Sequence, residues 1–185
     1  MPRLTTVGHG TADRDTLLGL FRGVAAGRIV DVRRFPGSRR NPDVSADALA
    51  GWLPAGGIDY RWEPRLGGRR RLPPAAGPPA DPWWRVEAFR AYAAHTRTAE
   101  FRDAMAELLA HLTDVPGTTL VMCSESLWWR CHRRLVSDVA VLLHGVEVEH
   151  LGHDGRLTPH TAAVGARVTA DGLVYDLAPE PEDRP

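Results

Sequence analysis

The apolar positions of the chain follow two spacings that alternate along its length. Short runs rich in β-branched and apolar residues, bounded by glycine, proline or charged residues, are typical of strands. They predict strands at residues 4–8, 28–32, 58–62, 118–123 and 146–151, with a further β-like segment at 166–175. Between these runs, apolar residues recur at the spacing of one helix face. We expect helices between Asp13 and Gly27 and at 45–53, 84–95, 99–112 and 132–143.

This alternation of strands and helices predicts an α/β fold. We expect a single domain with an open, mostly parallel, Rossmann-like sheet of about five strands and helices on both faces. No internal repeat or linker divides the sequence, so the domain is expected to span residues 1–178. Residues 179–185 are acidic and rich in proline, and we expect this tail to fray.

The overall composition is that of a soluble globular protein, with 43% hydrophobic and 25% charged residues. No apolar stretch approaches the roughly 18 residues that a membrane helix needs, and the chain does not open on a signal peptide. Two cysteines fit a reducing compartment. We therefore expect a cytoplasmic protein without membrane contact.

Charge is balanced overall but unevenly placed. All 23 basic residues are arginine, which excludes lysine-based Schiff-base chemistry. Arginines outnumber acids in residues 33–71, whereas residues 171–185 are mainly acidic. A local basic surface on a neutral protein favours an anionic ligand over a bulk nucleic-acid coat.

The segments that follow the expected strands carry the reactive side chains. Ligands of open parallel sheets bind beyond the carboxyl ends of the strands. His9 follows the first strand, and an arginine-rich loop at 33–42 follows the second. A proline- and glycine-rich segment at 63–82 follows the third, and 123–125 follows the fourth. These segments are expected to face one crevice.

Cys123 is a candidate nucleophile because backbone amides and nearby arginines lower the pKa of a thiol at such a position. Glu125, His9 and His132 are its candidate acid–base partners. The loop is similar to those of rhodaneses and cysteine phosphatases, but the spacing from Cys123 to Arg130 is one residue longer than the phosphatase pattern. The alternative of a buried structural cysteine stays open.

Cys131 is expected in the first turn of the helix at 132–143, where the helix dipole would stabilise a thiolate. No cofactor is predicted from these residues. A zinc ion is an alternative, held by the two cysteines and one histidine of the set His9, His132, His150 and His153. The spacing of the cysteines differs from that of common zinc fingers.

Arginines and one serine supply the expected anion site. The candidate substrate-binding residues are Arg33, Ser38, Arg39, Arg69, Arg133 and Trp129. Trp129, with Trp128 beside it, is a candidate platform for stacking a planar ligand, and helix packing is the alternative. For the arginines the alternative is a solvated charged loop.

The sequence resembles the DUF488 family, a group of bacterial and archaeal proteins without a settled function. The resembling motifs are VGHGT (7–11), VDVRRFPGSRRNP (30–42), GIDY (57–60), LGGRR (66–70), FRAYAAH (89–95), EFRDAM (100–105), VMCSESLWWRCHRRLVSD (121–138), VEVEHL (146–151) and LTPH (157–160). One departure is Gly10, where a hydroxyl residue is expected directly after the histidine. The resemblance implies a compact α/β fold and supplies no reaction.

Three functions remain open on these grounds. The first is an enzyme that acts on an anionic substrate, derived from a nucleotide or a nucleic acid, through the Cys/Glu/His/Arg site. The second is a non-catalytic module that binds nucleic acid or a phosphorylated small molecule. The third is a metal- or redox-sensing protein that uses Cys123 and Cys131. The sequence does not predict an oligomeric state.

Overall fold

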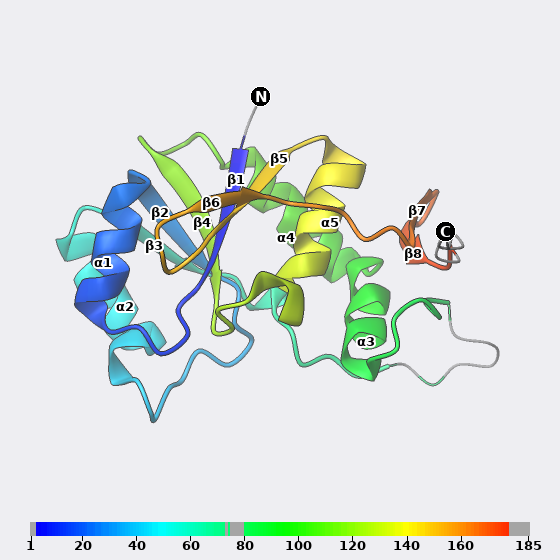
Figure 1. The fold of residues 1–185 in the computed structure, drawn as a ribbon, viewed down its shortest axis with the longest axis horizontal. Coiled ribbons are helices and arrows are strands. Elements are labelled where there is room, and N and C mark those ends of the chain that lie inside the picture. Colours follow the sequence, from blue (N-terminus) through cyan, green and yellow to red (C-terminus); the bar gives the residue numbers. More distant parts are fainter. Residues whose placement is uncertain (1–2, 73, 75–79, 178–185) are drawn as a thin grey trace, which may run out of the picture.

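Six strands form the central sheet of the protein, in the order β3-β2-β4-β1-β5-β6 (Figure 1). The computed structural model describes residues 3–72, 74 and 80–177. The strands are β1 (Arg3–Gly8), β2 (Ala26–Asp31), β3 (Asp59–Trp62), β4 (Thr118–Cys123), β5 (Glu147–Leu151) and β6 (Leu157–Pro159). The first five are parallel, which confirms the expected sheet, and β6 adds an antiparallel edge strand. The tail at 179–185 lies outside the described residues.

Five helices cover the sheet on its two faces, as Figure 1 shows. They are α1 (Arg14–Gly23), α2 (Ala46–Ala55), α3 (Glu87–Thr96), α4 (Ala99–Ala110) and α5 (Arg133–His144). Asp13 caps α1 by accepting a hydrogen bond from the Thr16 amide at 2.9 Å, and Ser45 caps α2 in the same way. Within the described residues, none of the helices is long and apolar enough to cross a membrane.

Two apolar clusters lie on opposite faces of the sheet. One packs against α1 and α2 and includes Leu17, Phe21, Leu49 and Leu53. The other packs against α3, α4 and α5 and includes Tyr92, Phe101, Met105, Leu135 and Val139. Strand side chains alternate between the two faces, so Leu120 and Met122 of β4 belong to the first cluster and Val121 and Cys123 to the second. Cys123 therefore faces α5.

Trp84 lies before α3 and not within it, so the expected helix start at residue 84 is wrong. Its ring packs against Phe89 and Tyr175, with centroids 4.8 and 5.1 Å away. The Trp83 amide donates to the Tyr175 carbonyl and the Trp84 amide to the Asp81 carbonyl. These bonds tie the segment to the strand of Tyr175, and this pairing replaces the first turn of a helix.

The β-like segment at 166–175 forms a separate hairpin of β7 (Ala166–Thr169) and β8 (Gly172–Tyr175). Leu173 and Tyr175 of β8 are buried against the cluster of α3, α4 and α5. The hairpin stands at the α3 end of the molecule in Figure 1. It extends the core on that face without joining the central sheet.

Strand order determines where a ligand crevice forms. The connection from β1 runs through α1 to β2, and the connection from β4 runs through α5 to β5 on the opposite face. β1 and β4 are neighbours in the sheet. The loops that follow them leave toward opposite faces, and such a switch point is where open α/β sheets bind ligands.

Candidate functional site

A cavity of about 270 Å³ lies at this switch point. It is lined by residues that follow β1, β2, β3 and β4: His9, Arg33, Arg34, Phe35, Gly37, Ser38, Gly68, Arg69, Ser124 and His132. We refer to it as the strand-end cavity. The expectation that loops after several strands face one crevice is confirmed for His9, Arg33, Ser38, Arg69 and His132.

A larger cavity of about 930 Å³ adjoins it and shares Arg34, Phe35 and Arg69 with it. We call it the outer cavity. Its other lining residues are Arg70, Arg71, Ala91, Ala94, His95 and Thr98. Among the described residues, five arginines and no aspartate or glutamate contribute to the two linings. Arg33 is paired with Asp31 and Arg70 with Glu100, so the other three arginines, Arg34, Arg69 and Arg71, supply the positive charge that has no acidic partner among the described residues.

Arg33 is held rigidly in the wall of the strand-end cavity. Its Nε donates to Asp31 Oδ1 at 2.8 Å and its Nη2 to Asp31 Oδ2 at 2.6 Å, a bidentate pair that is buried on both sides. The same Nη2 donates to the Val44 carbonyl. Tyr60 also donates to Asp31, and burial, followed by the Asp31 charge, raises the pKa of Tyr60. Much of the charge of Arg33 is therefore neutralised within the protein.

His9 is the imidazole that contacts Arg33. Its Nδ1 lies 2.9 Å from the Gly10 carbonyl and must donate to it, which leaves Nε2 to accept from Arg33 Nη1 at 3.2 Å. Burial lowers the pKa of His9 below its usual value. His9 is thus a neutral imidazole with its lone pair directed at a guanidinium on the cavity wall.

His132 is the second imidazole at this cavity. Its Nε2 is buried and has no hydrogen-bond partner among the described residues. Burial, with the Arg133 charge adding to it, lowers its pKa to about 3. Its ring packs 5.1 Å from that of Tyr92, and a Cβ on Gly68 would come within 2.9 Å of its Nδ1. Gly68 therefore allows the 66–70 loop to close over His132.

The arginines with unsatisfied charge lie farther out. Arg34 and Arg69 are exposed, and Arg34 Nη1 donates to the Arg69 carbonyl at 3.0 Å. Phe35 is 61% exposed and lies 5.4 Å from the Arg34 guanidinium. Arg70 differs because three backbone carbonyls of residues 64–67 accept its hydrogen bonds. The open positive charge is thus supplied mainly by Arg34, Arg69 and Arg71.

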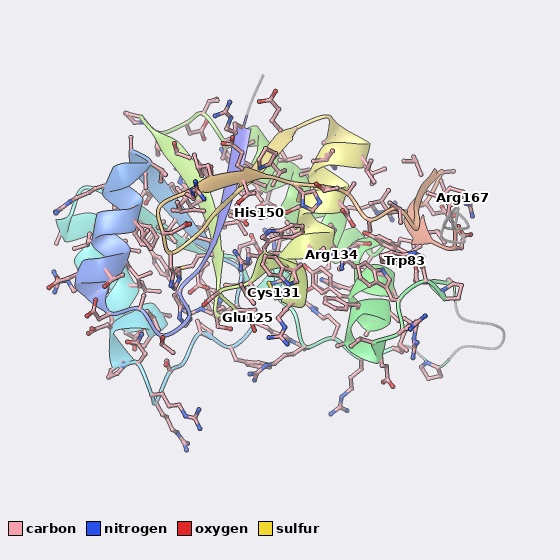
Figure 2. The ribbon with its side chains drawn as sticks, viewed as in Figure 1. Trp83, Glu125, Cys131, Arg134, His150 and Arg167 are labelled. Atoms are coloured by element: carbon pink, nitrogen blue, oxygen red, sulfur yellow. The ribbon has the colours of Figure 1, made fainter. Side chains whose placement is uncertain are left out.

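The two thiols form a separate site on the α5 face of the sheet. Cys123 Sγ lies 3.3 Å from Cys131 Sγ, and no disulfide joins them. Cys123 is 1% exposed, whereas Cys131 is partly exposed. Figure 2 places Cys131 near Glu125 and close to the centre of the molecule, away from Trp83 and Arg167 at the β7–β8 end. Neither sulfur lines the strand-end or the outer cavity.

Arg133 donates hydrogen bonds both to Cys131 and to Thr6 of β1. It is 1% exposed, and its Nε donates to Cys131 Sγ at 3.3 Å. Its other acceptors are Thr6 Oγ1 at 3.4 Å and the carbonyls of Glu125 and Ser126. None of these is a carboxylate. A buried charge without an anionic partner is strongly unfavourable, so a thiolate on Cys131 is the natural partner of this guanidinium.

The two thiols differ in protonation as a result. The hydrogen bond from Cys123, together with the Arg133 charge, lowers the pKa of Cys131 to about 6 in spite of burial. Burial and the neighbouring Cys131 raise the pKa of Cys123 well above its usual value. These opposite shifts favour Cys131 as the thiolate of the pair and Cys123 as the thiol that donates to it.

A buried hydrogen-bonded chain, which we call the α5 chain, leads away from Arg133. Thr6 Oγ1 lies 2.6 Å from His150 Nδ1, His150 Nε2 lies 2.9 Å from His160 Nδ1, and His160 Nε2 lies 2.8 Å from Asp138 Oδ1. With both imidazoles neutral, each bond has one donor and one acceptor, directed from Arg133 towards the Asp138 carboxylate. Burial lowers the pKa of His150 to about 3, which agrees with that assignment. Trp128 stacks on His150 at 4.0 Å.

Glycines allow the loop after β4 to pass over the end of β1. A Cβ on Gly8 would come within 1.8 Å of the Glu125 carbonyl and 2.8 Å of Arg133 Nη2. Gly10 has a φ of 53° and lies against Ser126. A larger residue at either position would push the loop out. The glycine directly after His9, which departs from the expected hydroxyl residue, thus has a packing role here.

Several expected site residues lie elsewhere. Cys131 precedes α5 and ends the short turn Trp128–Arg130, so its placement in the first turn of the helix is wrong. Glu125 Oε1 accepts from the Leu127 amide at 3.2 Å. Arg39 and Trp129 are exposed but line neither cavity. Arg133 is expected at the anion site, but its guanidinium donates to the Cys131 sulfur instead.

Arg34 of the arginine-rich loop and Ser124 of the 123–125 segment lie at the strand-end cavity, as expected for those segments. The sequence did not single out Phe35 in this cavity, or Thr6, His160 and Asp138 in the α5 chain. A signal existed for Asp138, because it is an acidic residue within the apolar run Leu135, Val136, Val139 and Ala140 of the helix. For zinc, the structure brings the two thiols together. In the described part of the chain, however, no group of three or more His, Cys, Asp or Glu is placed to hold a metal ion.

The fold and these strand-end sites define an α/β protein with an arginine-lined crevice and an adjacent pair of thiols. The chain belongs to the DUF488 family, whose model, described as a domain of unknown function, matches residues 17–140. No curated protein matches the chain, and no solved structure does. The family assignment confirms the resemblance seen in the motifs.

Proposed function

We propose that the protein binds a phosphate-bearing ligand, a nucleotide or a short single-stranded nucleic acid, in the strand-end and outer cavities. One observation carries this proposal: among the described residues, the adjoining walls hold five arginines and no acidic side chain, and three of these arginines have no acidic partner. Arginine guanidinium groups match phosphate oxygens in geometry as well as in charge.

The two cavities differ in a way that suits such a ligand. Arg33 and His9, bonded to each other and to Asp31, form a rigid inner wall, in which Arg33 Nη1 is left to donate to one phosphate oxygen. Arg34, Arg69 and Arg71 lie around the wider outer cavity, whose volume of about 930 Å³ is in the range of small-molecule sites. The exposed ring of Phe35 lies at the junction and offers a stacking surface for a base.

Salt-dependent binding tests this proposal. Fluorescence anisotropy with a labelled oligonucleotide, and with a labelled nucleoside triphosphate, should show binding that weakens as the salt concentration rises. The double variant Arg34→Ala/Arg69→Ala should weaken binding by at least about tenfold, because it removes two phosphate contacts.

The matched control is Arg22→Ala/Arg102→Ala, which removes the same charge from exposed positions on α1 and α4 that line neither cavity. It should bind within about twofold of the wild type, because its lost charges act only at long range. Binding unaffected by salt, or an equal loss in both double variants, would contradict the proposal.

Catalysis on the bound ligand is the second candidate function. It is favoured by two imidazoles, His9 and His132, at one cavity wall. His9 Nε2 becomes available as a general base once the bound ligand takes over its donor, Arg33 Nη1. Cys123 is not part of this proposal, because its buried thiol lies outside both cavities. Turnover of a bound nucleotide or oligonucleotide that is lost in His9→Gln while binding persists would support it. Equal turnover in His9→Gln and the wild type would contradict it.

A further inference from the structure

The two thiols stand apart from the arginine-lined cavities and have a geometry of their own. We propose that Cys131 and Cys123 form a peroxide-reactive pair, in which Cys131 reduces a hydroperoxide and Cys123 then closes a disulfide with it. This activity lies outside the proposed ligand-binding function. Neither sulfur lines a cavity that the ligand would occupy.

Cys131 has the properties of the attacking thiol. Its sulfur accepts a hydrogen bond from Arg133 Nε at 3.3 Å, and the buried guanidinium has no carboxylate among its bonded partners. A thiolate, not a thiol, is the nucleophile towards peroxide. Cys131 is partly exposed and Cys123 is 1% exposed, so Cys131 is the one of the two residues that a small hydroperoxide is expected to reach first.

Arg133 is held in place by the α5 chain on one side and by the loop after β4 on the other. Thr6 accepts from Nη1, and the carbonyls of Glu125 and Ser126 accept from Nη2. Thr6 and His150 lie on the α5 face of their strands, as Cys123 does, because side chains alternate along a strand. The guanidinium is thus fixed beside Cys131 before any oxidant arrives.

Cys123 has the properties of the resolving thiol. It is buried at the end of β4, and its Sγ lies 3.3 Å from that of Cys131. A disulfide requires the two sulfurs to approach to about 2.05 Å. The sulfurs therefore need to move little more than 1 Å, a shift on the scale of side-chain adjustment. Burial keeps Cys123 away from a direct reaction with solutes.

The proposed reaction has two steps. In the first, the Cys131 thiolate attacks one oxygen of the hydroperoxide and the O–O bond breaks. This gives a sulfenic acid on Cys131 and an alkoxide or hydroxide, which takes a proton from solvent. In the second, Cys123 loses its proton and attacks the Cys131 sulfur, the S–O bond breaks, and hydroxide leaves with that proton as water. The two thiols are oxidised by two electrons and the peroxide is reduced to an alcohol, or to water.

The test treats freshly reduced full-length protein with one equivalent of hydrogen peroxide at pH 7. Intact mass should show the loss of two hydrogen atoms. Trypsin cleaves after Arg130 and so separates the two cysteines, which makes the disulfide visible as a linked pair of peptides. The reaction should be about tenfold faster than that of free cysteine, because most of Cys131 is already thiolate.

The two single variants assign the roles. In Cys123→Ser the oxidation should stop at a sulfenic acid on Cys131, which dimedone traps as a mass adduct. In Cys131→Ser the remaining thiol should react at least about tenfold more slowly, because Cys123 is buried and protonated. Far-UV circular dichroism checks that both variants fold.

The wild-type protein alone decides the proposal even if a variant fails to fold. Two free thiols after treatment, a disulfide between two chains, or a rate no faster than that of free cysteine would each overturn it. None of these outcomes bears on oligonucleotide or nucleotide binding. Failure of this proposal and failure of the proposed function are therefore separate results.

Discussion

Arginine has opposite tasks in two neighbouring regions of this molecule. Arg133 is 1% exposed, and its N–H groups donate to the Cys131 sulfur, a hydroxyl and two carbonyls. Arg34 and Arg69 are exposed at the rim of cavities in which no acidic side chain contributes to the lining within the described part of the chain. The buried guanidinium is surrounded by acceptors that the protein supplies, whereas the exposed guanidinium groups remain available to a ligand. The difference arises from burial, because a charge removed from water must be matched within the fold.

The largest effect is expected for Arg133→Met, which removes the buried charge and keeps an unbranched side chain. Thr6 and two carbonyls lose their donor, and the variant should lose roughly 3 kcal/mol of unfolding free energy. Urea denaturation followed by circular dichroism measures it. The same variant should raise the pKa of Cys131, seen as slower alkylation by iodoacetamide at pH 7.

The control for this variant is Arg102→Met on the exposed face of α4, which should stay within about 0.5 kcal/mol of the wild type. A loss below about 1 kcal/mol in Arg133→Met would show that the buried guanidinium does not organise this region.

Asp138→Asn tests the far end of the α5 chain. The carboxylate accepts from His160, from the Tyr175 hydroxyl and from the Ala163 amide. An amide of the same shape accepts with only one oxygen, so the variant should lose about 2 kcal/mol in the same denaturation experiment. Asp171→Asn, in an exposed turn, is the matched control and should change stability by less than about 0.5 kcal/mol. Equal stability of the two variants would mean that the hydrogen bonds of the α5 chain do not stabilise the fold.

The pH dependence of stability follows from two buried imidazoles. Burial lowers the pKa of His132 and of His150 to about 3, from the usual 6.5. Between these values the unfolded chain binds protons that the folded chain does not, so stability is complete above pH 6.5 and falls as the pH drops towards 3. The slope approaches about 1.4 kcal/mol per pH unit for each histidine.

Urea denaturation at pH 7 and pH 5 measures this loss, because few carboxylates titrate in that interval. Stability that is equal at the two pH values would mean that both imidazoles are protonated in the folded protein.

The smallest effect on stability is expected for the rim arginines. Arg34→Ala/Arg69→Ala should change the unfolding free energy by less than about 0.5 kcal/mol for each substitution, because exposed charges contribute little. A thermal melt checks this next to the binding measurement. A loss of unfolding free energy comparable to that of Arg133→Met would show that Arg34 and Arg69 stabilise the fold as Arg133 does. The contrast between the two regions would then be wrong.

Local patterns in the sequence predict most of the elements but not all of their ends. The five parallel strands follow from apolar runs, and the helix caps Asp13 and Ser45 are visible as capping residues. The strand β6 was not expected because its three residues carry no run long enough to indicate a strand. The start of α3 was set too early, because the bonds of Asp81 and Tyr175 that hold Trp84 outside the helix join positions far apart in the sequence.

The candidate site was predicted in part for the same reason. His9, Arg33, Ser38, Arg69 and His132 meet at one cavity, as expected from the rule that parallel strands end at the same edge. That rule does not distinguish between the two faces of the sheet. Cys123, Cys131 and Arg133 lie beyond the same strand ends but on the side of α5, apart from the cavity.

The sequence by itself determined the strand–helix alternation, the residues that end each strand and the alternation of side chains between the two faces. These depend on neighbours in the chain. Only the tertiary structure decided that Arg133 is buried beside Cys131 without a carboxylate, and that Arg34 and Arg69 remain exposed. Burial and pairing depend on segments such as β1, β5 and the 66–70 loop, which reach these side chains only in the folded protein. For this reason arginine is a buried structural residue in one region and an exposed residue of the candidate ligand site in the other.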